Sequence, residues 1–279
     1  MKNGIRRGIA AALAVVAAAA VAVGAAGTGS AAAPSSLKAF GLTSNGTTMV
    51  AFTTDRPDVL NWVRKPSGLV GDTALSGLDF RVQDGKLYAL GNRGGIYTVL
   101  VTSDERVLLT KVSQLTVALQ GAFFDVDFNP AADRLRIVSD TGQNLRHNLN
   151  DHTTVVDGIL TSNGVTAVGY TNNDLNSDTA TTLFGINTLT DQTVIVAPPN
   201  NGTLNPTGST VVKIEPNAGC DIFSDLVNGK AVAATAFCAF DPEGPGTNGL
   251  YTVNLLNGEA TLVGEFPLDI TEVAVALQS

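Results

Sequence analysis

Eight Asn-Gly or Asp-Gly pairs divide the chain after residue 37, and they constrain its fold more than any other feature. They begin at residues 45, 84, 157, 163, 201, 228, 248 and 257. Both residues of such a pair readily adopt positive φ, which the tight turns of antiparallel hairpins require. Short runs of β-branched and aromatic residues lie between the pairs, and helical periodicity is almost absent. The sequence therefore predicts antiparallel sheet throughout.

Two strand phrases recur together along the chain. The first is an apolar residue, then Asp or Gly, then an aromatic or apolar residue, and it occurs at 78–80, 126–128, 168–170 and, more loosely, 224–226. The second follows at 87–90, 135–138, 183–186 and 250–253. Successive first phrases are 48, 42 and 56 residues apart. This spacing fits the period of about 40–50 residues that is typical of four-stranded propeller blades, with one long and irregular blade.

The two ends of the chain together complete one further blade. Residues 270–277 form an apolar strand with no partner after it, whereas 37–65 resemble outer strands without an inner strand before them. Pairing these segments would close a ring of blades, which bury their faces against one another. We predict an all-β propeller of five four-stranded blades in a single domain over 37–279; a sandwich or an irregular solenoid is the alternative. The expected blades are 37–70 with 268–277, 74–115, 120–160, 164–213 and 219–267.

The first 32 residues have the three parts of an export signal. Basic residues come first, an apolar run follows over 9–23, and small residues end the segment at Ser30-x-Ala32. A retained membrane anchor is the alternative, but the apolar run is short for a span of about 20 residues. We predict a signal peptide over 1–32, cleaved after Ala32, a short tail over 33–36 and a secreted product without a membrane span.

The charge and composition exclude two classes of protein. The formal net charge is −8, and it becomes −11 once the three basic residues of the signal peptide are removed. Such a surface repels a phosphate backbone, so we expect no nucleic-acid partner. With 44% hydrophobic and 15% charged residues, the chain is not a disordered polyelectrolyte. We expect a monomer.

One long segment resembles a known bacterial family. Residues 127–146 (Asp-Phe-Asn-Pro-Ala-Ala-Asp-Arg-Leu-Arg-Ile-Val-Ser-Asp-Thr-Gly-Gln-Asn-Leu-Arg) are similar to the signature of "domain of unknown function 4394". The segments 170–174, 181–186, 250–254 and 258–264 resemble later parts of the same family, so the similarity spans roughly 37–277. The resemblance implies a secreted or surface β-propeller without an established activity. It therefore assigns no catalytic residue.

Cys220 and Cys238 are the only cysteines, and a predicted hairpin turn lies midway between them at Asn228-Gly229. A two-residue turn would pair residue 220 with 237, so one bulged residue is needed to bring the cysteines opposite each other. In an exported chain this arrangement favours a disulfide. Two buried free thiols are the alternative.

Carboxylates on the predicted inner strands are candidate cation ligands. Asp125, Asp127 and Asn129 alternate and so point to one side of a strand. Asp79, Asp127 and Asp225 occupy matching positions in three repeats, where they would converge on a central channel. Oxygen ligands of this kind suit Ca²⁺, although the turn Gly and closing Glu of a calcium loop are missing. In the alternative interpretation these side chains accept hydrogen bonds from the backbone or from the nearby arginines Arg81, Arg134 and Arg136.

A second set of candidates lies in a loop, and no residues form a complete catalytic motif. Tyr170, Asn172, Asn173 and Asp174 place an aromatic ring beside polar groups, which suits a carbohydrate or a peptide; such residues also simply form loops. His147 and His152 lie in a polar stretch, and we expect both on the surface. The sequence contains neither a Gly-x-Ser-x-Gly elbow nor a Gly-Lys-Ser/Thr phosphate loop.

These observations favour a secreted binding or scaffold module that uses the loops of one face. Its partner would be an extracellular polymer, a protein or a small molecule. Two alternatives stay open: a divalent-cation-dependent hydrolase or lactonase with channel carboxylates, and a structural envelope protein. The sequence leans against an enzyme, and Ca²⁺ is the one cofactor that it suggests.

Overall fold

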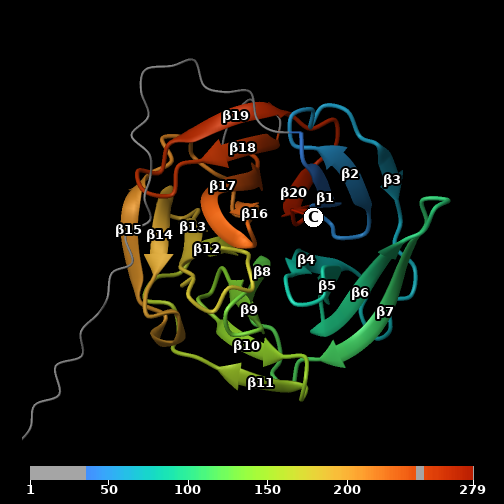
Figure 1. Cartoon of the computed structure of the whole chain (residues 1–279), viewed down its shortest axis with the longest axis horizontal. Coiled ribbons are helices and arrows are strands. Elements are labelled where there is room, and N and C mark those ends of the chain that lie inside the picture. Colours follow the sequence, from blue (N-terminus) through green and yellow to red (C-terminus); the bar gives the residue numbers. More distant parts are fainter. Residues whose placement is uncertain (1–35, 243–247, 279) are drawn as a thin grey trace, which may run out of the picture. The chain divides into compact units, whose positions relative to one another are not determined.

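The computed structural model describes residues 36–242 and 248–278, which form twenty strands in five four-stranded antiparallel sheets. The predicted signal peptide and residues 33–35 of the tail lie outside the described residues. The predicted all-β propeller of five blades is confirmed (Figure 1). In the described residues the only helical element is the 3₁₀ turn η1 (Pro199–Asn201), and no helix there is long and apolar enough to cross a membrane.

Each blade runs from an inner strand at the axis to an outer strand at the rim (Figure 1). Blade 1 contains β20 (Ile270–Val275), β1 (Lys38–Thr43), β2 (Met49–Thr53) and β3 (Trp62–Arg64). Blade 2 contains β4 (Leu75–Arg81), β5 (Lys86–Gly91), β6 (Gly95–Val101) and β7 (Val107–Gln114). Blade 3 contains β8 (Phe124–Asn129), β9 (Arg134–Ser139), β10 (Asn144–Asn148) and β11 (Thr153–Val156).

The last two blades follow the same plan. Blade 4 contains β12 (Val165–Tyr170), β13 (Leu183–Asn187), β14 (Gln192–Val196) and β15 (Leu204–Ser209). Blade 5 contains β16 (Gly219–Val227), β17 (Lys230–Phe240), β18 (Gly249–Val253) and β19 (Ala260–Glu265). Every strand falls inside the blade that the repeat period predicted for it.

The last strand closes the ring, as the unmatched ends of the sequence predicted. β20 pairs antiparallel with β1, so that Ala39 lies opposite Val275 and Gly41 opposite Val273. Blade 1 therefore takes its inner strand from the end of the chain and its three outer strands from the beginning. An opening of the ring at this point would expose two strand edges.

The Asn-Gly and Asp-Gly pairs have two structural roles. Those at 45, 84, 228 and 257 form the tight connections of hairpins, and Asn228 and Gly229 both have positive φ, 52° and 72°. The pairs at 157 and 163 instead lie in the connection between blades 3 and 4, and those at 201 and 248 directly precede strands. The prediction of antiparallel sheet is correct, but only half of the pairs are tight hairpin turns.

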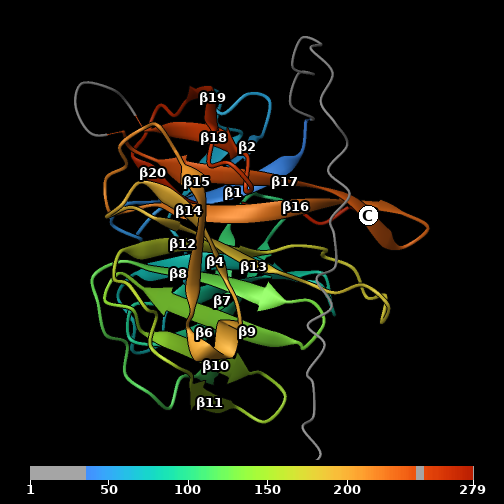
Figure 2. The same cartoon turned by 90° about the vertical axis from the view of Figure 1, so that its left-hand side faces the viewer.

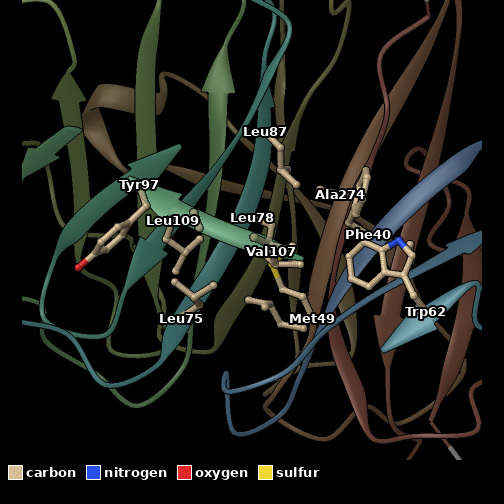
Figure 3. Close-up of a cluster of buried hydrophobic side chains, with 13 residues drawn as sticks. Phe40, Met49, Trp62, Leu75, Leu78, Leu87, Tyr97, Val107, Leu109 and Ala274 are labelled. Carbon is tan, nitrogen blue, oxygen red and sulfur yellow. The ribbon is translucent and has the colours of Figure 1, made fainter. Parts of the chain in front are cut away.

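Apolar side chains fill the spaces between neighbouring blades. Between blades 1 and 2, Phe40, Met49 and Trp62 pack with Leu75 and Leu78 (Figure 3). The rings of Phe40 and Trp62 are 5.9 Å apart between centroids. Burial of each such side chain contributes about 1.5–3 kcal/mol, so these layers hold the blades together.

The disulfide is present. Cys220 and Cys238 are bonded and lie directly opposite each other on β16 and β17. A register shift between Asp225 and Leu226 supplies the bulged residue that the sequence required. The disulfide thus links the two innermost strands of blade 5 covalently.

Candidate functional site

Five buried acidic side chains on the inner strands form the candidate site. They come from blades 1, 2, 3 and 5, and their relative exposure is between 1% and 5%. A buried carboxylate is unfavourable unless hydrogen bonds, a proton or a cation compensate its charge. The five are Asp79 on β4, Asp125 and Asp127 on β8, Asp221 on β16 and Glu272 on β20.

Several of these carboxylates accept backbone N–H groups from the inner strand of another blade. The acceptor and donor pairs are Oδ2 of Asp79 with Phe128 (2.6 Å), Oδ2 of Asp125 with Val168 (2.7 Å) and Oδ2 of Asp221 with Val275 (2.6 Å). Oδ2 of Asp125 also accepts the N–H of Cys220 on β16 at 3.2 Å. The acidic side chains therefore tie the inner strands together, which agrees with the structural alternative stated above.

Three of the carboxylates meet on the axis. Asp79, Asp127 and Asp221 each offer an oxygen, and these oxygens lie within 4.8 Å of one another. Oxygens on opposite sides of a bound Ca²⁺ are about 4.6–5.2 Å apart, because each lies about 2.3–2.6 Å from the ion. Among the described residues, Oδ1 of Asp221 and Oε2 of Glu272 are buried without a hydrogen-bond partner. Three strands thus bring one carboxylate oxygen each to a spacing that suits a hard cation.

Burial raises the pKa of every carboxyl group in the site. For Asp79 and Asp127 the pKa lies well above the usual range, first because of burial and then because of neighbouring carboxylates. Burial raises the pKa of Asp125 to about 7 and that of Asp221 to about 6. Burial, followed by the neighbouring carboxylate of Asp125, raises the pKa of Glu272 well above its usual range. Burial therefore disfavours the charged form of each group, and a bound cation would favour it again.

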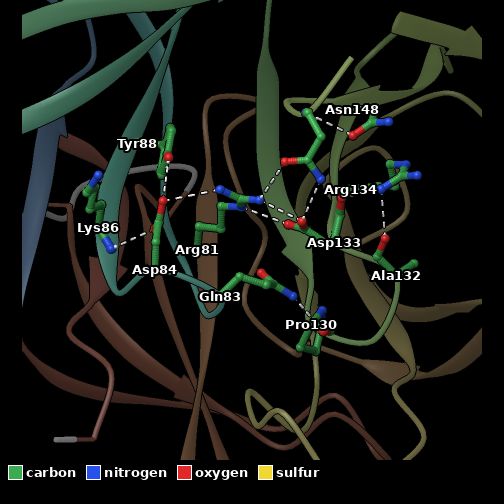
Figure 4. A network of polar contacts seen from close by, with 11 residues as sticks. Arg81, Gln83, Asp84, Lys86, Tyr88, Pro130, Ala132, Asp133, Arg134 and Asn148 are labelled. Carbon is green, nitrogen blue, oxygen red and sulfur yellow. Dashed lines mark hydrogen bonds and ion pairs between the residues drawn. The ribbon is translucent and has the colours of Figure 1, made fainter. Parts of the chain in front are cut away.

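The arginines that could have neutralised these groups are engaged elsewhere. Arg81 forms ion pairs with Asp84 in its own blade and with Asp133 in blade 3, and Arg134 donates to the backbone carbonyl of Ala132 (Figure 4). Arg136 is buried and pairs with Asp157 at 2.6 Å. The alternative with arginine partners is therefore not what the structure shows.

Two of the predicted ligands lie away from this centre. Asp225 is exposed, because β16 continues beyond the ring into a protruding hairpin with β17 (Figure 2). In blade 5 the residue that joins Asp79 and Asp127 is Asp221, which lies four positions before Asp225. Asn129 uses its Oδ1 to accept the N–H groups of the two alanines in its own turn. Asp221 was missed because the phrase at 224–226 was matched to the wrong part of a long strand, and Glu272 because the closing strand at 270–277 was considered only as an apolar segment.

The loop candidates are occupied by contacts within the protein. Tyr170, Asn173 and Asp174 are buried, and Asn172, with φ 62°, donates from Nδ2 to its own loop at Ala180. Nδ2 of Asn173 donates to the carbonyl of Ile222 on β16, at 3.0 Å. Oδ2 of Asp174 accepts the N–H of Ala231 on β17 at 2.8 Å, and Arg136 donates to the Tyr170 hydroxyl. This segment holds blade 4 against blade 5, and its polar groups are used in these contacts.

Both histidines were expected on the surface, and this prediction is wrong for one of them. His152 is exposed, but His147 is fully buried, at 0% relative exposure. Polar neighbours in the sequence suggested a surface position, whereas β10 turns the ring of His147 toward β7 of blade 2, where Ser113 accepts or donates a hydrogen bond.

A separate surface cavity of about 290 Å³ lies where blades 5 and 1 meet. Its acidic side chains are Glu215, Asp241 and Asp269, and burial followed by the charge of Asp269 raises the pKa of Asp241. Asp269 also accepts hydrogen bonds from Ser44 and Asn248. This cavity was not foreseen, because its lining comes from four separate connections between strands.

Comparison with known proteins identifies a family and distant structural similarities. The family model "Domain of unknown function (DUF4394)" matches residues 48–276. Among curated proteins, none matches the chain significantly. A structural genomics protein of unknown function from Bacteroides thetaiotaomicron is 13% identical with a TM-score of 0.46, over 87% of this chain and 68% of that chain. Glutaminyl cyclase from Myxococcus xanthus is 10% identical with a TM-score of 0.45, over 79% of this chain and 97% of that chain. Similarity of this extent says nothing about activity.

Proposed function

Since the chain belongs to the DUF4394 family, whose description assigns no activity, we propose a function from its own geometry. The protein is an exported propeller that binds a divalent cation, Ca²⁺, on its axis and serves as a scaffold or binding module. The cation is a structural ion that joins the inner strands of three blades.

The central oxygen atoms carry this proposal. Asp79, Asp127 and Asp221 come from blades 2, 3 and 5, and their ligand atoms lie within 4.8 Å of one another. Oδ1 of Asp221 has no hydrogen-bond partner among the described residues, although it is buried. A cation at this point satisfies that oxygen and compensates three neighbouring charges at once.

The chemistry of the ligands favours calcium over a transition metal. All the candidate ligand atoms are carboxylate oxygens, which suit hard cations such as Ca²⁺ and Mg²⁺. Calcium tolerates irregular geometry and variable coordination number, whereas Mg²⁺ demands a near-ideal octahedron. Three carboxylates fixed by separate strands match the more tolerant ion.

Burial supports a structural role for the ion and not a catalytic one. A Lewis-acid metal needs a coordination position that substrate can reach. Asp79, Asp127 and Asp221 are only 2–4% exposed, so little of this centre faces solvent. We therefore favour the scaffold or binding module over the cation-dependent hydrolase or lactonase.

Export is the second part of the proposal. The disulfide between Cys220 and Cys238 fits an oxidising compartment. The basic start, apolar run and small residues before Ala33 fit a signal peptide that is cleaved after Ala32. A monomeric mature protein would present its loops to an extracellular polymer, protein or small molecule. The acidic cavity between blades 5 and 1 favours positively charged groups on that partner.

Thermal unfolding of stripped and calcium-loaded protein tests the cation site. Ca²⁺ at 100 times its Kd should stabilise the protein by about 2.7 kcal/mol, and metal analysis should find about one calcium per chain. Asp127→Asn should remove most of this stabilisation, whereas the exposed Asp225→Asn should keep it. An unchanged melting temperature after chelation, with no metal copurifying, would contradict the proposal.

The mass of the secreted protein tests export independently. The mature chain should begin at Ala33, and denatured, unreduced protein should contain no free thiol. A product that keeps residues 1–32, or that shows two reactive thiols after export, would contradict this part of the proposal alone.

A further inference from the structure

Both histidines of the chain point at one serine hydroxyl. Nε2 of His147 lies 2.8 Å from Oγ of Ser113, and Nδ1 of His152 lies 2.9 Å from the same oxygen. Ser113 is on β7 in blade 2, whereas His147 is on β10 and His152 follows it in the turn to β11, both in blade 3. Two ring nitrogens and an oxygen from neighbouring blades therefore converge at one place at the rim.

In both rings the nitrogen that faces Ser113 can be unprotonated and can then offer its lone pair to a metal. Nδ1 of His147 lies 3.0 Å from Oγ1 of Thr154, and His152 is exposed, so its other nitrogen faces water. Each neutral ring can carry its single proton on that far nitrogen. Oγ1 of Thr154 accepts the N–H of Thr116 at 3.0 Å and has a second lone pair for the proton of His147. A hydrogen-bond partner of this kind fixes the tautomer of a metal-binding histidine.

Each ring nitrogen lies from Oγ of Ser113 at about the spacing of neighbouring metal ligands. With metal–nitrogen distances of about 2.0–2.1 Å, adjacent ligand atoms lie about 2.9–3.4 Å apart, depending on the coordination geometry. The two nitrogen–oxygen distances here are 2.8 and 2.9 Å. We propose that Ser113, His147 and His152 form a binding site for a late divalent transition metal, such as Zn²⁺, across the junction of blades 2 and 3.

The surroundings favour a bound cation at this place. His147 is fully buried and His152 is exposed, so the site lies where the protein interior meets solvent. Asp151 is next to His152 in the sequence, and its exposed carboxylate attracts a cation. His152 has φ 61°, a left-handed conformation that few non-glycine residues adopt, and water can reach its ring to fill the remaining metal positions.

This site is chemically distinct from the axial carboxylates. Imidazole nitrogens prefer zinc, copper and nickel, whereas carboxylate oxygens prefer calcium. A saturating concentration of Ca²⁺ should therefore leave both histidine rings unaffected, and zinc binding at the rim does not depend on the axial site.

Nuclear magnetic resonance of the two imidazoles tests the proposal, since the chain has only two histidines. Untagged, ¹⁵N-labelled protein in excess Ca²⁺ is titrated with Zn²⁺, and long-range ¹H–¹⁵N signals of both rings are followed. Both rings should shift together and reach saturation at one equivalent of Zn²⁺. A response limited to His152, or no response from either ring, would overturn the proposal and leave adventitious surface binding only.

A matched variant separates metal binding from folding. His152→Gln changes an exposed side chain that makes one hydrogen bond, to Ser113, so without zinc the variant should still fold and melt within a few degrees of the wild type. In this variant the zinc response of His147 should weaken at least tenfold. If His147 shifts with unchanged affinity after this substitution, the two rings do not share one metal and the proposal is wrong.

Discussion

Single residues decide the chemistry at the centre of the ring, and only some of them could be identified from the sequence. Asp79 and Asp127 were predicted because each stands in the middle of a recurring strand phrase. Asp221 could not be placed correctly, since β16 continues past the ring and offers a second acidic residue, Asp225, four positions later. The position of His147 depends on how blade 3 packs against blade 2, which no local pattern reveals.

A partly buried ion pair between blades predicts a specific pH dependence. Nε and Nη2 of Arg81 donate to the two carboxylate oxygens of Asp133 at 2.7 and 2.6 Å. The Arg81 guanidinium holds the pKa of Asp133 below its usual value of 3.8. A lowered pKa in the folded state gives stability above the unfolded pKa, and this stability is lost as the pH falls through the folded pKa.

We therefore expect Asp133→Asn to lower the free energy of unfolding by about 1–3 kcal/mol at pH 7. The difference from the wild type should shrink progressively below pH 4, as the wild-type carboxylate becomes protonated. Urea unfolding between pH 2 and pH 7 measures both effects. Asp104→Asn, which breaks an exposed pair with Arg106, is the control and should change little. A penalty for Asp133→Asn that is the same at every pH would contradict this account.

At the scale of elements, the sequence predicted hairpins better than the connections between blades. Alternating strands and Asn-Gly turns define a hairpin locally, so β16 and β17 were expected on either side of Asn228-Gly229, with one bulge. The pairs at 157 and 163 have the same composition, but contacts between blades 3 and 4 determine their conformation. Long-range packing therefore overrides a local turn signal where strands do not pair directly.

The disulfide in this hairpin should contribute measurably to stability. It links residues separated by 18 positions, and loss of loop-closure entropy in the unfolded chain predicts a contribution of about 3 kcal/mol. Replacement of both Cys220 and Cys238 by Ser should lower the denaturation midpoint accordingly, without loss of the propeller. Equal stability of oxidised wild type and the double variant in urea would show that the bond adds nothing.

The whole molecule depends on closure of the ring. The number of blades was predictable because an unmatched inner strand at one end complemented three unmatched strands at the other. The central carboxylates require this closure, since Oδ2 of Asp221 accepts the N–H of Val275 on β20. The group of buried carboxylates could not be derived in full from the repeats, because blade 4 carries Gly169 in place of an acidic residue and blade 1 carries Glu272.

Removal of the closing strand should unfold the protein cooperatively. A chain that ends at residue 269 lacks β20, so β1 keeps only β2 as a pairing partner and β16 loses the strand that packs against it from blade 1. We expect it to lose the protected amides of all five blades in hydrogen exchange, because each blade buries its face against the next. Retention of a cooperative transition at the wild-type temperature would mean that the ring does not need its closure.

The proposed cation lies between Asp79, Asp127 and Asp221. Manganese prefers the same oxygen ligands and scatters X-rays anomalously, so crystals soaked in Mn²⁺ test the claim directly. The anomalous difference map should contain its strongest peak on the axis, within about 2.0–2.6 Å of one oxygen from each of the three carboxylates. A map with no density there, in crystals where manganese occupies other sites, would contradict the account.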